Sequence, residues 1–141
     1  MIVNSNWIKK YLKSFWPIDD IWLFDRSFFL LDESTIKKII TELSVKTMKY
    51  VPELWDCDNF SLLLNSDVKK YQYDCIQCSK PKTPHYPWAF GECIGTKFRG
   101  VEMNHSVNIA VCKDGIFFVD PQNNYMWKAD QKNDDLYFIK I

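Results

Sequence analysis

The order of helical and strand patterns along the chain predicts an α+β fold, with N-terminal helices packed on an antiparallel sheet. Three segments of the first half repeat apolar residues at helical spacing, whereas the second half alternates short apolar runs with turn residues. Helices that precede an antiparallel sheet in sequence are typical of α+β proteins. The length of 141 residues suits a single domain, so one domain is expected over residues 1–141.

The first two helices are predicted from their caps and their apolar stripes. Asn4 or Ser5 can cap a helix that ends before Pro17, and its apolar residues are Trp7, Ile8, Tyr11, Leu12 and Phe15. An irregular aromatic stretch, 21–31, follows. Residues 32–35 then open a second helix, whose buried stripe is expected to be Ile36, Ile39, Ile40 and Leu43.

A third helix is predicted to begin near Cys57 and to last until about Tyr71. It is followed by a stretch rich in Pro, Lys and polar residues, 73–87, which favours a long surface loop. Strands are expected at 88–95, 104–112, 116–120 and 136–141. Asp114-Gly115 predicts the tight turn of a hairpin.

Composition limits the functions and locations to be considered. Eighteen basic residues balance eighteen acidic ones, which disfavours nucleic acid as a partner because nucleic-acid-binding proteins usually carry a basic surplus. The pattern of a secretory signal or a membrane-spanning segment is not seen, so we expect a cytoplasmic protein without a membrane partner. Five cysteines in such a chain favour reduced thiols or a metal site over a disulfide framework.

Cys57 is the candidate nucleophile because it stands in the first turn of a predicted helix. The unpaired N–H groups and partial positive charge of a helix N-terminus lower the pKa of a thiol, and the thiolate is the reactive form. Of the two histidines, His105 at the start of a strand is the better-anchored base, and a third group must orient its ring. Asp120 ends the next strand. One of the numbers 105 and 120 is odd and the other even, and in an antiparallel hairpin that turns at Asp114-Gly115 this puts the two side chains on one face of the sheet.

The register of this hairpin leaves the orienting residue open. A two-residue turn at Asp114-Gly115 sets His105 opposite Asn124, so contact with Asp120 requires a bulge or a wider loop. Gln122 and Asn124 can replace Asp120 as the acceptor of the imidazole hydrogen bond. Trp55, beside the candidate nucleophile, is expected to line a substrate pocket.

Two further groups of residues are metal candidates. Cys75 and Cys78 have the spacing of half a zinc site that His85 and Cys93 could complete, but a single CxxC motif is a weak signal, so a pair of loop thiols is the favoured explanation and zinc is not expected. A zinc-stabilised adaptor built on this site is one hypothesis. Asp56 and Asp58 are first interpreted as carboxylates that complement the helix dipole.

The segments 50–60, 104–108 and 119–122 together resemble the papain-like and transglutaminase-like cysteine enzymes. The similarity extends over about residues 28 to 122 and is strongest to small phage-associated and lectin-fused members, which include the protease domain of a mushroom agglutinin. It implies a papain-like fold, peptide or amide substrates, and a calcium requirement met by Asp56 and Asp58. Papain carries an upstream glutamine for the oxyanion hole, and residues 48–53 hold none, so backbone N–H groups or Trp55 would have to serve.

Two functions are therefore expected. The first is a cysteine-dependent hydrolase or acyl-transferase that acts on a peptide or amide bond through Cys57, His105 and Asp120. The alternative is a catalytically inactive papain-like fold, phage-encoded and active in the host cytoplasm, that inhibits or binds a host or defence protein stoichiometrically.

Overall fold

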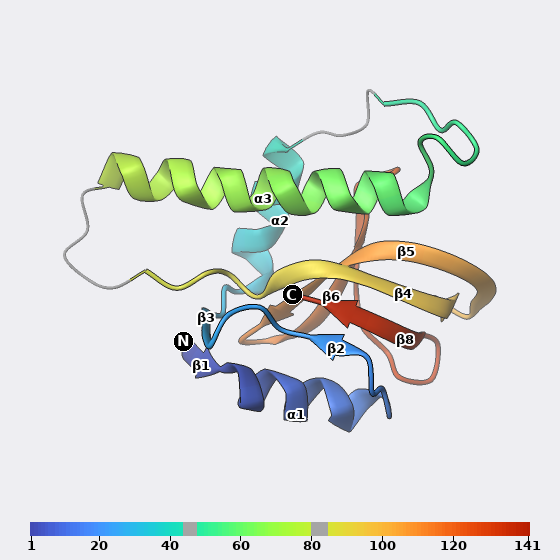
Figure 1. Ribbon diagram of the computed structural model, residues 1–141, viewed down its shortest axis with the longest axis horizontal. Helices are drawn as coiled ribbons and strands as arrows, with labels where there is room; N and C mark the ends of the chain where they lie inside the picture. Colours follow the sequence, from blue (N-terminus) through green and yellow to red (C-terminus); the bar gives the residue numbers. More distant parts are fainter. Residues whose placement is uncertain (44–47, 80–84) are drawn as a thin grey trace.

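The computed structural model consists of a curved sheet with helices on both of its faces. It describes residues 1–43, 48–79 and 85–141. Figure 1 shows α3 across one face of the sheet and α1 below the opposite face, with α2 behind α3. The helices are α1 (Ser5–Phe15), α2 (Glu33–Glu42) and α3 (Cys57–Ser79).

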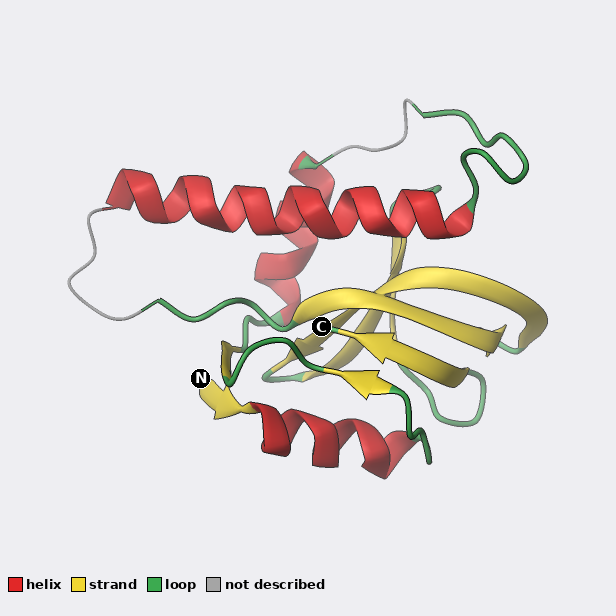
Figure 2. Ribbon diagram, in the orientation of Figure 1, coloured by secondary structure: helices red, strands yellow, loops and turns green. Residues whose placement is uncertain are grey.

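Six strands form the main sheet, in the order β2-β8-β4-β5-β6-β7, and two more form a small separate ribbon, β1-β3. Figure 2 shows these strands in yellow between the helices. The strands of the main sheet are β2 (Ile21–Trp22), β4 (Phe90–Phe98), β5 (Val101–Cys112), β6 (Gly115–Asp120), β7 (Tyr125–Lys128) and β8 (Asp135–Lys140). The ribbon consists of β1 (Ile2–Asn4) and β3 (Ser27–Phe29).

The expected arrangement, N-terminal helices packed on an antiparallel sheet, is wrong in two respects. The sheet is mixed, because β2 pairs with β8 in parallel, Ile21 opposite Ile139. The helices do not share one face, since α1 packs into one core cluster and α2 and α3 into another. A two-residue strand such as β2 has no period that a sequence pattern can reveal, and only its partner on the sheet edge defines it.

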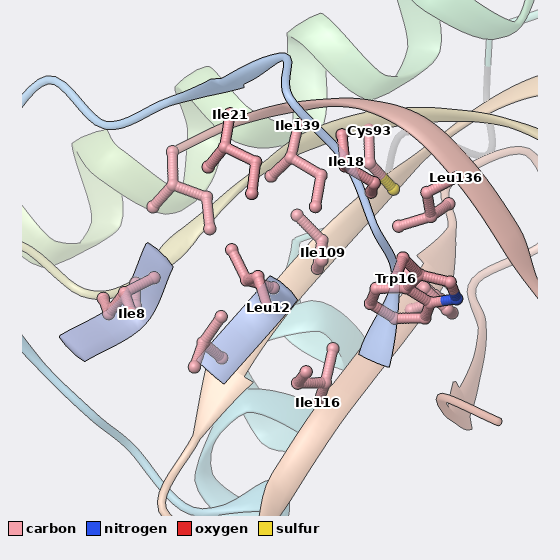
Figure 3. Close-up of a cluster of buried hydrophobic side chains, with 14 of the residues drawn as sticks. Ile8, Leu12, Trp16, Ile18, Ile21, Cys93, Ile109, Ile116, Leu136 and Ile139 are labelled. Atoms are coloured by element: carbon pink, nitrogen blue, oxygen red, sulfur yellow. The ribbon is translucent and has the colours of Figure 1, made fainter. Parts of the chain in front are cut away.

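The core on the α1 face is built as the apolar stripe of that helix predicts. The side chain of Asn4 accepts a hydrogen bond from the Trp7 N–H at 2.8 Å and caps the helix, and Ile8 and Leu12 are fully buried. Figure 3 shows both residues directed toward Ile109 and Ile116 of the sheet. The first predicted helix is confirmed.

The opposite face is covered by α2 and α3. Phe60, Leu64 and Val68 of α3 pack in the second core cluster with the α2 stripe Ile36, Ile39 and Ile40. The predicted start of α3 at Cys57 is confirmed, but the helix continues to Ser79, so the predicted loop is wrong over residues 73–79. Its remaining part includes residues 80–84, which lie outside the described residues.

The predicted turn of the β5–β6 hairpin is displaced by one residue. Cys112 pairs with Gly115, so Lys113 and Asp114 form the two-residue turn rather than Asp114-Gly115. Tertiary contacts favour this turn. The Lys113 N–H donates to the Leu31 carbonyl at 2.9 Å, and the Asp114 carboxylate accepts from the first backbone N–H of α2, that of Glu33, at 3.1 Å.

Within the described residues, every helix is too short or too polar to pass through a lipid bilayer.

Candidate ligand pocket around His105 and Asp120

The hairpin register brings His105 and Asp120 together. Ile109 pairs with Phe118 on β5 and β6, and continuation of this register sets Asp120 diagonally next to His105 on the same face of the sheet. The His105 Nε2 atom lies 3.4 Å from Asp120 Oδ2. The bulge or wider loop that the sequence analysis required is absent from this hairpin, because the shifted turn supplies the register.

Both side chains are held by further contacts. The other carboxylate oxygen of Asp120, Oδ1, accepts a hydrogen bond from the Gln122 backbone N–H at 3.1 Å. The His105 ring packs edge-on against Phe98, with ring centroids 6.1 Å apart. The side chains of His105 and Asp120 keep only 11% and 22% of their surface exposed, so the pair is a fixed polar feature rather than a mobile surface contact.

A pocket of about 350 Å³ opens over this pair. Its walls come from the ends of β4 and β6, the start of β5, the loop after β6, and β7. This volume is near the lower end of the range for small-molecule sites, roughly 300–1,000 Å³. The lining residues are Phe98, Arg99, Val101, Met103, His105, Asp120, Gln122 and Trp127.

Cys57 does not belong to this pocket. It is half-buried at the first turn of α3, and α3 packs on the face of the sheet opposite to the one that carries His105. The neighbour Ser106 bonds α3 through Ser61, which shows that alternate residues of β5 face opposite sides. Among the described residues, the Cys57 thiol forms no hydrogen bond with His105 or Asp120.

Two further candidates also lie away from the pocket: Asn124, expected to orient the His105 ring, and Trp55, expected to line a substrate pocket. Asn124 has a positive φ of 56°, and its side-chain amide donates to the Ile40 carbonyl of α2 at 3.4 Å. Trp55 packs edge-on against Phe60, with ring centroids 6.0 Å apart, on the α3 side of the sheet. Of the residues proposed around His105, Gln122 alone joins Asp120 in the pocket lining.

Asp56 and Asp58 are close enough to interact. A hydrogen bond with the Asp58 carboxyl, together with desolvation and the charge of Asp58, raises the pKa of Asp56. The Asp56 Oδ1 atom is buried and has no hydrogen-bond partner in the described structure. These two carboxylates could hold a cation, although the described residues contain no cluster of three or more His, Cys, Asp or Glu side chains arranged for a metal.

The four candidate zinc ligands do not converge. Cys75 and Cys78 are exposed near the end of α3, and His85 is exposed beyond residues 80–84. Cys93 is fully buried in the core on the other side of the sheet, where Figure 3 shows its sulfur near Leu136 and Ile18. The structure therefore does not bring these four side chains together, because Cys93 faces the side of β4 away from the helix that carries Cys75 and Cys78.

The sequence did not single out Arg99 or Trp127 as site residues, although both line the pocket. Arg99 follows β4 in a left-handed conformation, φ 53°, and its guanidinium lies 4.1 Å from the centre of the Tyr125 ring. Trp127 of β7 forms the adjacent wall of the pocket. The sequence Arg99-Gly100 indicates a turn. It gives no sign that this turn will contact β7, which lies two strands beyond β5 at the edge of the sheet.

Solved structures with the same fold include chains about twice as long as this protein. A structure of a PSL1a-E64 complex matches with a TM-score of 0.75 and 20% identity, over 97% of this chain and 49% of that chain. Polyporus squamosus lectin, bound to the human-type influenza-binding epitope Neu5Aca2-6Galb1-4GlcNAc, matches with a TM-score of 0.73 and 20% identity, over 97% and 48%. A comparison with curated proteins finds no match.

These matches overturn the functional expectations from the sequence. The predicted membership of the papain-like and transglutaminase-like superfamily and the papain-like fold are wrong, since the family model described below is that of an agglutinin and one matching solved structure is that of Polyporus squamosus lectin. The predicted cysteine-dependent hydrolase or acyl-transferase is wrong for the same reason, as is the alternative of a phage-encoded papain-like inhibitor.

The comparison with protein families gives a specific assignment. Residues 28–126 match the model of the Agglutinin C-terminal family. The matched segment runs from β3 into β7 and contains α2, α3, the His105–Asp120 pair and most of the pocket. Because the match covers well over half of the chain, this protein belongs to the Agglutinin C-terminal family.

Proposed function

We propose that this domain binds a glycan in the His105 pocket. The pocket combines aromatic and polar groups in one concave surface, with Trp127 and Phe98 next to His105, Asp120 and Gln122. A sugar ring has an apolar face of C–H groups and an edge of hydroxyl groups, so aromatic rings and hydrogen-bonding side chains together suit it.

The polar side chains of the pocket are preorganised for ligand binding. Asp120 and His105 already hold each other, so neither has to be ordered when a ligand arrives. The Gln122 side-chain amide lines the pocket and has no hydrogen-bond partner among the described residues, which leaves both its donor and its acceptor for ligand hydroxyls. This prepared polar edge beside Trp127 is the observation that carries the proposal.

The comparisons support the proposal without supplying the ligand. One matched structure is a lectin bound to the epitope Neu5Aca2-6Galb1-4GlcNAc, and this chain corresponds to about half of that lectin. The ligand of the whole lectin is therefore the first probe for this domain. In this proposal His105, Asp120 and Gln122 are ligand-binding residues, and Cys57 has no contact with the ligand.

The test is a calorimetric titration of the folded protein with this trisaccharide, preceded by a glycan array that ranks other sugars. We expect saturable binding and a loss of about tenfold or more in affinity for Gln122→Ala, since tenfold corresponds to about 1.4 kcal/mol, near the value of one hydrogen bond. Gln131→Ala is the matched control, because Gln131 is an exposed glutamine outside the pocket. Its affinity should equal that of the wild type.

A second arm uses E64, the compound present in the other matched complex. The protein is incubated with E64 and its intact mass is measured, with Cys57→Ala as the comparison. An E64 adduct that disappears in Cys57→Ala, in a protein that binds no sugar on the array, would overturn the proposal and assign the ligand site to the start of α3.

A further inference from the structure

The end of α3 carries two exposed thiols that lie outside the proposed ligand pocket. Cys75 and Cys78 are both exposed, and Figure 1 shows the last turns of α3 projecting past the edge of the sheet. Residues three apart in an α-helix lie on one face, with their Cα atoms about 5 Å apart. Disulfide-bonded cysteines have Cα separations of roughly 4.4–6.8 Å, so the helix itself holds these two thiols at a suitable spacing.

The position of the pair at the helix end allows the thiols to come closer. A disulfide needs Cβ atoms about 3.5–4.5 Å apart, whereas neighbours on the face of a regular helix are about 5–6 Å apart. α3 ends at Ser79, so the last four carbonyl groups of the helix accept no hydrogen bond within it, and this turn distorts at little cost. The resulting bond is strained, and a strained disulfide is easily reduced again.

The helix face that carries the thiols also connects α3 to α2. Tyr71, one turn before Cys75, donates its hydroxyl to Glu42 Oε2 of α2 at 2.9 Å, and its ring centroid lies 6.4 Å from that of Trp88. The hydrogen bond to Glu42, burial and the charge of Glu42 raise the pKa of Tyr71, and the neighbouring Cys75 thiol adds to this effect. Cys75 therefore interacts with the side chain that joins the two helices.

The other three thiols are unsuitable partners for this pair. Cys57 begins the same helix, about 27 Å from Cys75 at a rise of about 1.5 Å per residue. Cys93 and Cys112 are only 0% and 3% exposed, and burial raises the pKa of both thiols. A small oxidant in solution therefore reaches Cys75 and Cys78 far more readily than the two buried thiols.

We propose that Cys75 and Cys78 form a redox-active dithiol that small disulfides of the glutathione class oxidise reversibly, and that the new bond loosens the contact of α3 with α2. The Cys78 thiolate attacks one sulfur of oxidised glutathione, whose S–S bond breaks and releases one glutathione thiolate. The Cys75 thiolate then attacks the Cys78 sulfur of the mixed disulfide and expels the second glutathione thiolate. The two protein thiols are oxidised, and their two protons pass to the two glutathione thiolates.

The direction of the movement explains the effect on α2. Tyr71 lies on the N-terminal side of Cys75 and Cys78 lies on its C-terminal side, so the Cys75 sulfur must turn from one to the other when the bond forms. The turn of α3 that follows Tyr71 is distorted at the same time. The hydrogen bond of Tyr71 with Glu42 is then weakened.

The first experiment incubates the reduced, folded protein with oxidised glutathione, alkylates the remaining thiols, and measures the intact mass and the peptide map. We expect the wild type to lose two hydrogen atoms within the peptide that contains Cys75 and Cys78, and to regain them with reduced glutathione. Cys78→Ser should stop at a mixed disulfide on Cys75. Cys57→Ser is the matched control and should close the bond as the wild type does.

A spacing variant tests whether the folded helix sets the reaction. Cys78→Ser combined with Gln77→Cys places the second thiol two residues from Cys75, on another side of the helix, so the folded variant should close its bond about tenfold more slowly or less. In urea the variant and the wild type should close at similar rates. Equal closure rates in the folded proteins, or a wild type that stops at mixed disulfides, would overturn the proposal.

The contact with α2 is tested by urea denaturation of the reduced and oxidised forms. Oxidation should lower the urea midpoint of the wild type, and should lower it less in Tyr71→Phe, which already lacks the hydroxyl that bonds Glu42. An equal fall in both proteins, or an unchanged midpoint in the wild type, would overturn the coupling between the dithiol and α2.

Discussion

The Oγ atoms of Ser61 and Ser106 lie 2.7 Å apart, in a buried contact that joins the first turns of α3 to β5. Next to it, the side-chain amide of Asn108 donates to the Ser61 carbonyl at 2.8 Å and to the Gly91 carbonyl at 3.0 Å. This polar cluster fastens α3 to the centre of the sheet. It also fixes where the first residue of α3, Cys57, stands relative to the strands.

Replacement of Asn108 by leucine should destabilise the protein strongly. The substitution removes the side-chain donor to two carbonyl groups and places an apolar side chain in a buried polar cluster, and we expect the free energy of unfolding to fall by about 2–3 kcal/mol. Urea denaturation followed by tryptophan fluorescence measures the change. Asn104→Leu is the matched control, since Asn104 is exposed and its side chain bonds the Tyr137 hydroxyl at the surface, and a loss as large as that of Asn108→Leu would argue against the polar cluster as the cause.

The β4–β8 contact requires the absence of a side chain at Gly91. A Cβ atom there would meet the Lys140 carbonyl oxygen of β8, which is backbone and cannot move aside alone. We expect Gly91→Ala to lower the free energy of unfolding by about 3 kcal/mol or to prevent folding, because overpacking must separate the two strands. Soluble yield and the urea midpoint report the outcome.

Gly100→Ala provides the contrasting case for this prediction. Its Cβ would have open space, with the nearest atom, Asn133 Oδ1, at 3.6 Å, but its φ of 78° disfavours a side chain. Strain of about 1–2 kcal/mol is expected there. If Gly100→Ala proved more damaging than Gly91→Ala, the close approach of β4 and β8 would not be the dominant constraint.

The five thiols should react with iodoacetamide in an order set by burial. Cys75 and Cys78 are exposed and should react first, whereas Cys93 is fully buried. Burial raises the pKa of Cys112 to about 12, so at pH 8 its thiolate is scarce and its alkylation should be about a hundredfold slower or more. Peptide mass spectrometry of timed samples gives the rates, with urea-unfolded protein as the control in which all five should react alike.

Asp32 should make stability depend on pH in the acidic range. Hydrogen bonds from Thr35 and Ser34, and one from Lys113, hold the pKa of this capping carboxylate well below its ordinary value. A pKa depressed in the folded state gives stability that is fully present above the unfolded pKa of about 3.9 and is lost as pH falls through the folded pKa. The difference in urea midpoint between wild type and Asp32→Ala should therefore be constant from about pH 7 to 5 and shrink below about pH 4.

Asp19→Ala is the control for the pH experiment, because Asp19 is an exposed carboxylate that only approaches Lys13, at 3.7 Å. Its difference from the wild type should stay small throughout. An Asp32→Ala difference that grew as the pH fell would contradict the assigned direction of the pKa shift.

Local signals in the sequence predicted the helices well. The caps of α1 and α2 are the predicted ones, their buried residues belong to the predicted stripes although Trp7 of α1 is exposed, and α3 begins at Cys57 as expected. The end of α3 was not predicted, because the Pro and Lys residues beyond the helix favour a loop from Tyr73 onward. No proline or glycine interrupts residues 73–79, so nothing in that segment stops the helix.

The candidate site was predicted in part. The odd and even positions of residues 105 and 120 in an antiparallel hairpin were sufficient to predict that both side chains lie on one face of the sheet. Gln122 was already a candidate acceptor for the His105 imidazole. The structure does not bring Cys57 to His105, because adjacent positions of a strand face opposite sides and α3 bonds Ser106 rather than His105. Chain order alone does not say which face of a sheet a helix covers.

What the sequence determined by itself is therefore local: helix starts, most strands, and which residues of a hairpin share a face. These follow from backbone periodicity and capping, which act within a few residues. The tertiary structure decided the parallel pairing of β2 with β8, the turn at Lys113-Asp114, and the meeting of Arg99 with Trp127 through Asp134. Each of these depends on partners distant in the chain, and their free energy is gained only when the complete sheet and both of its faces are assembled.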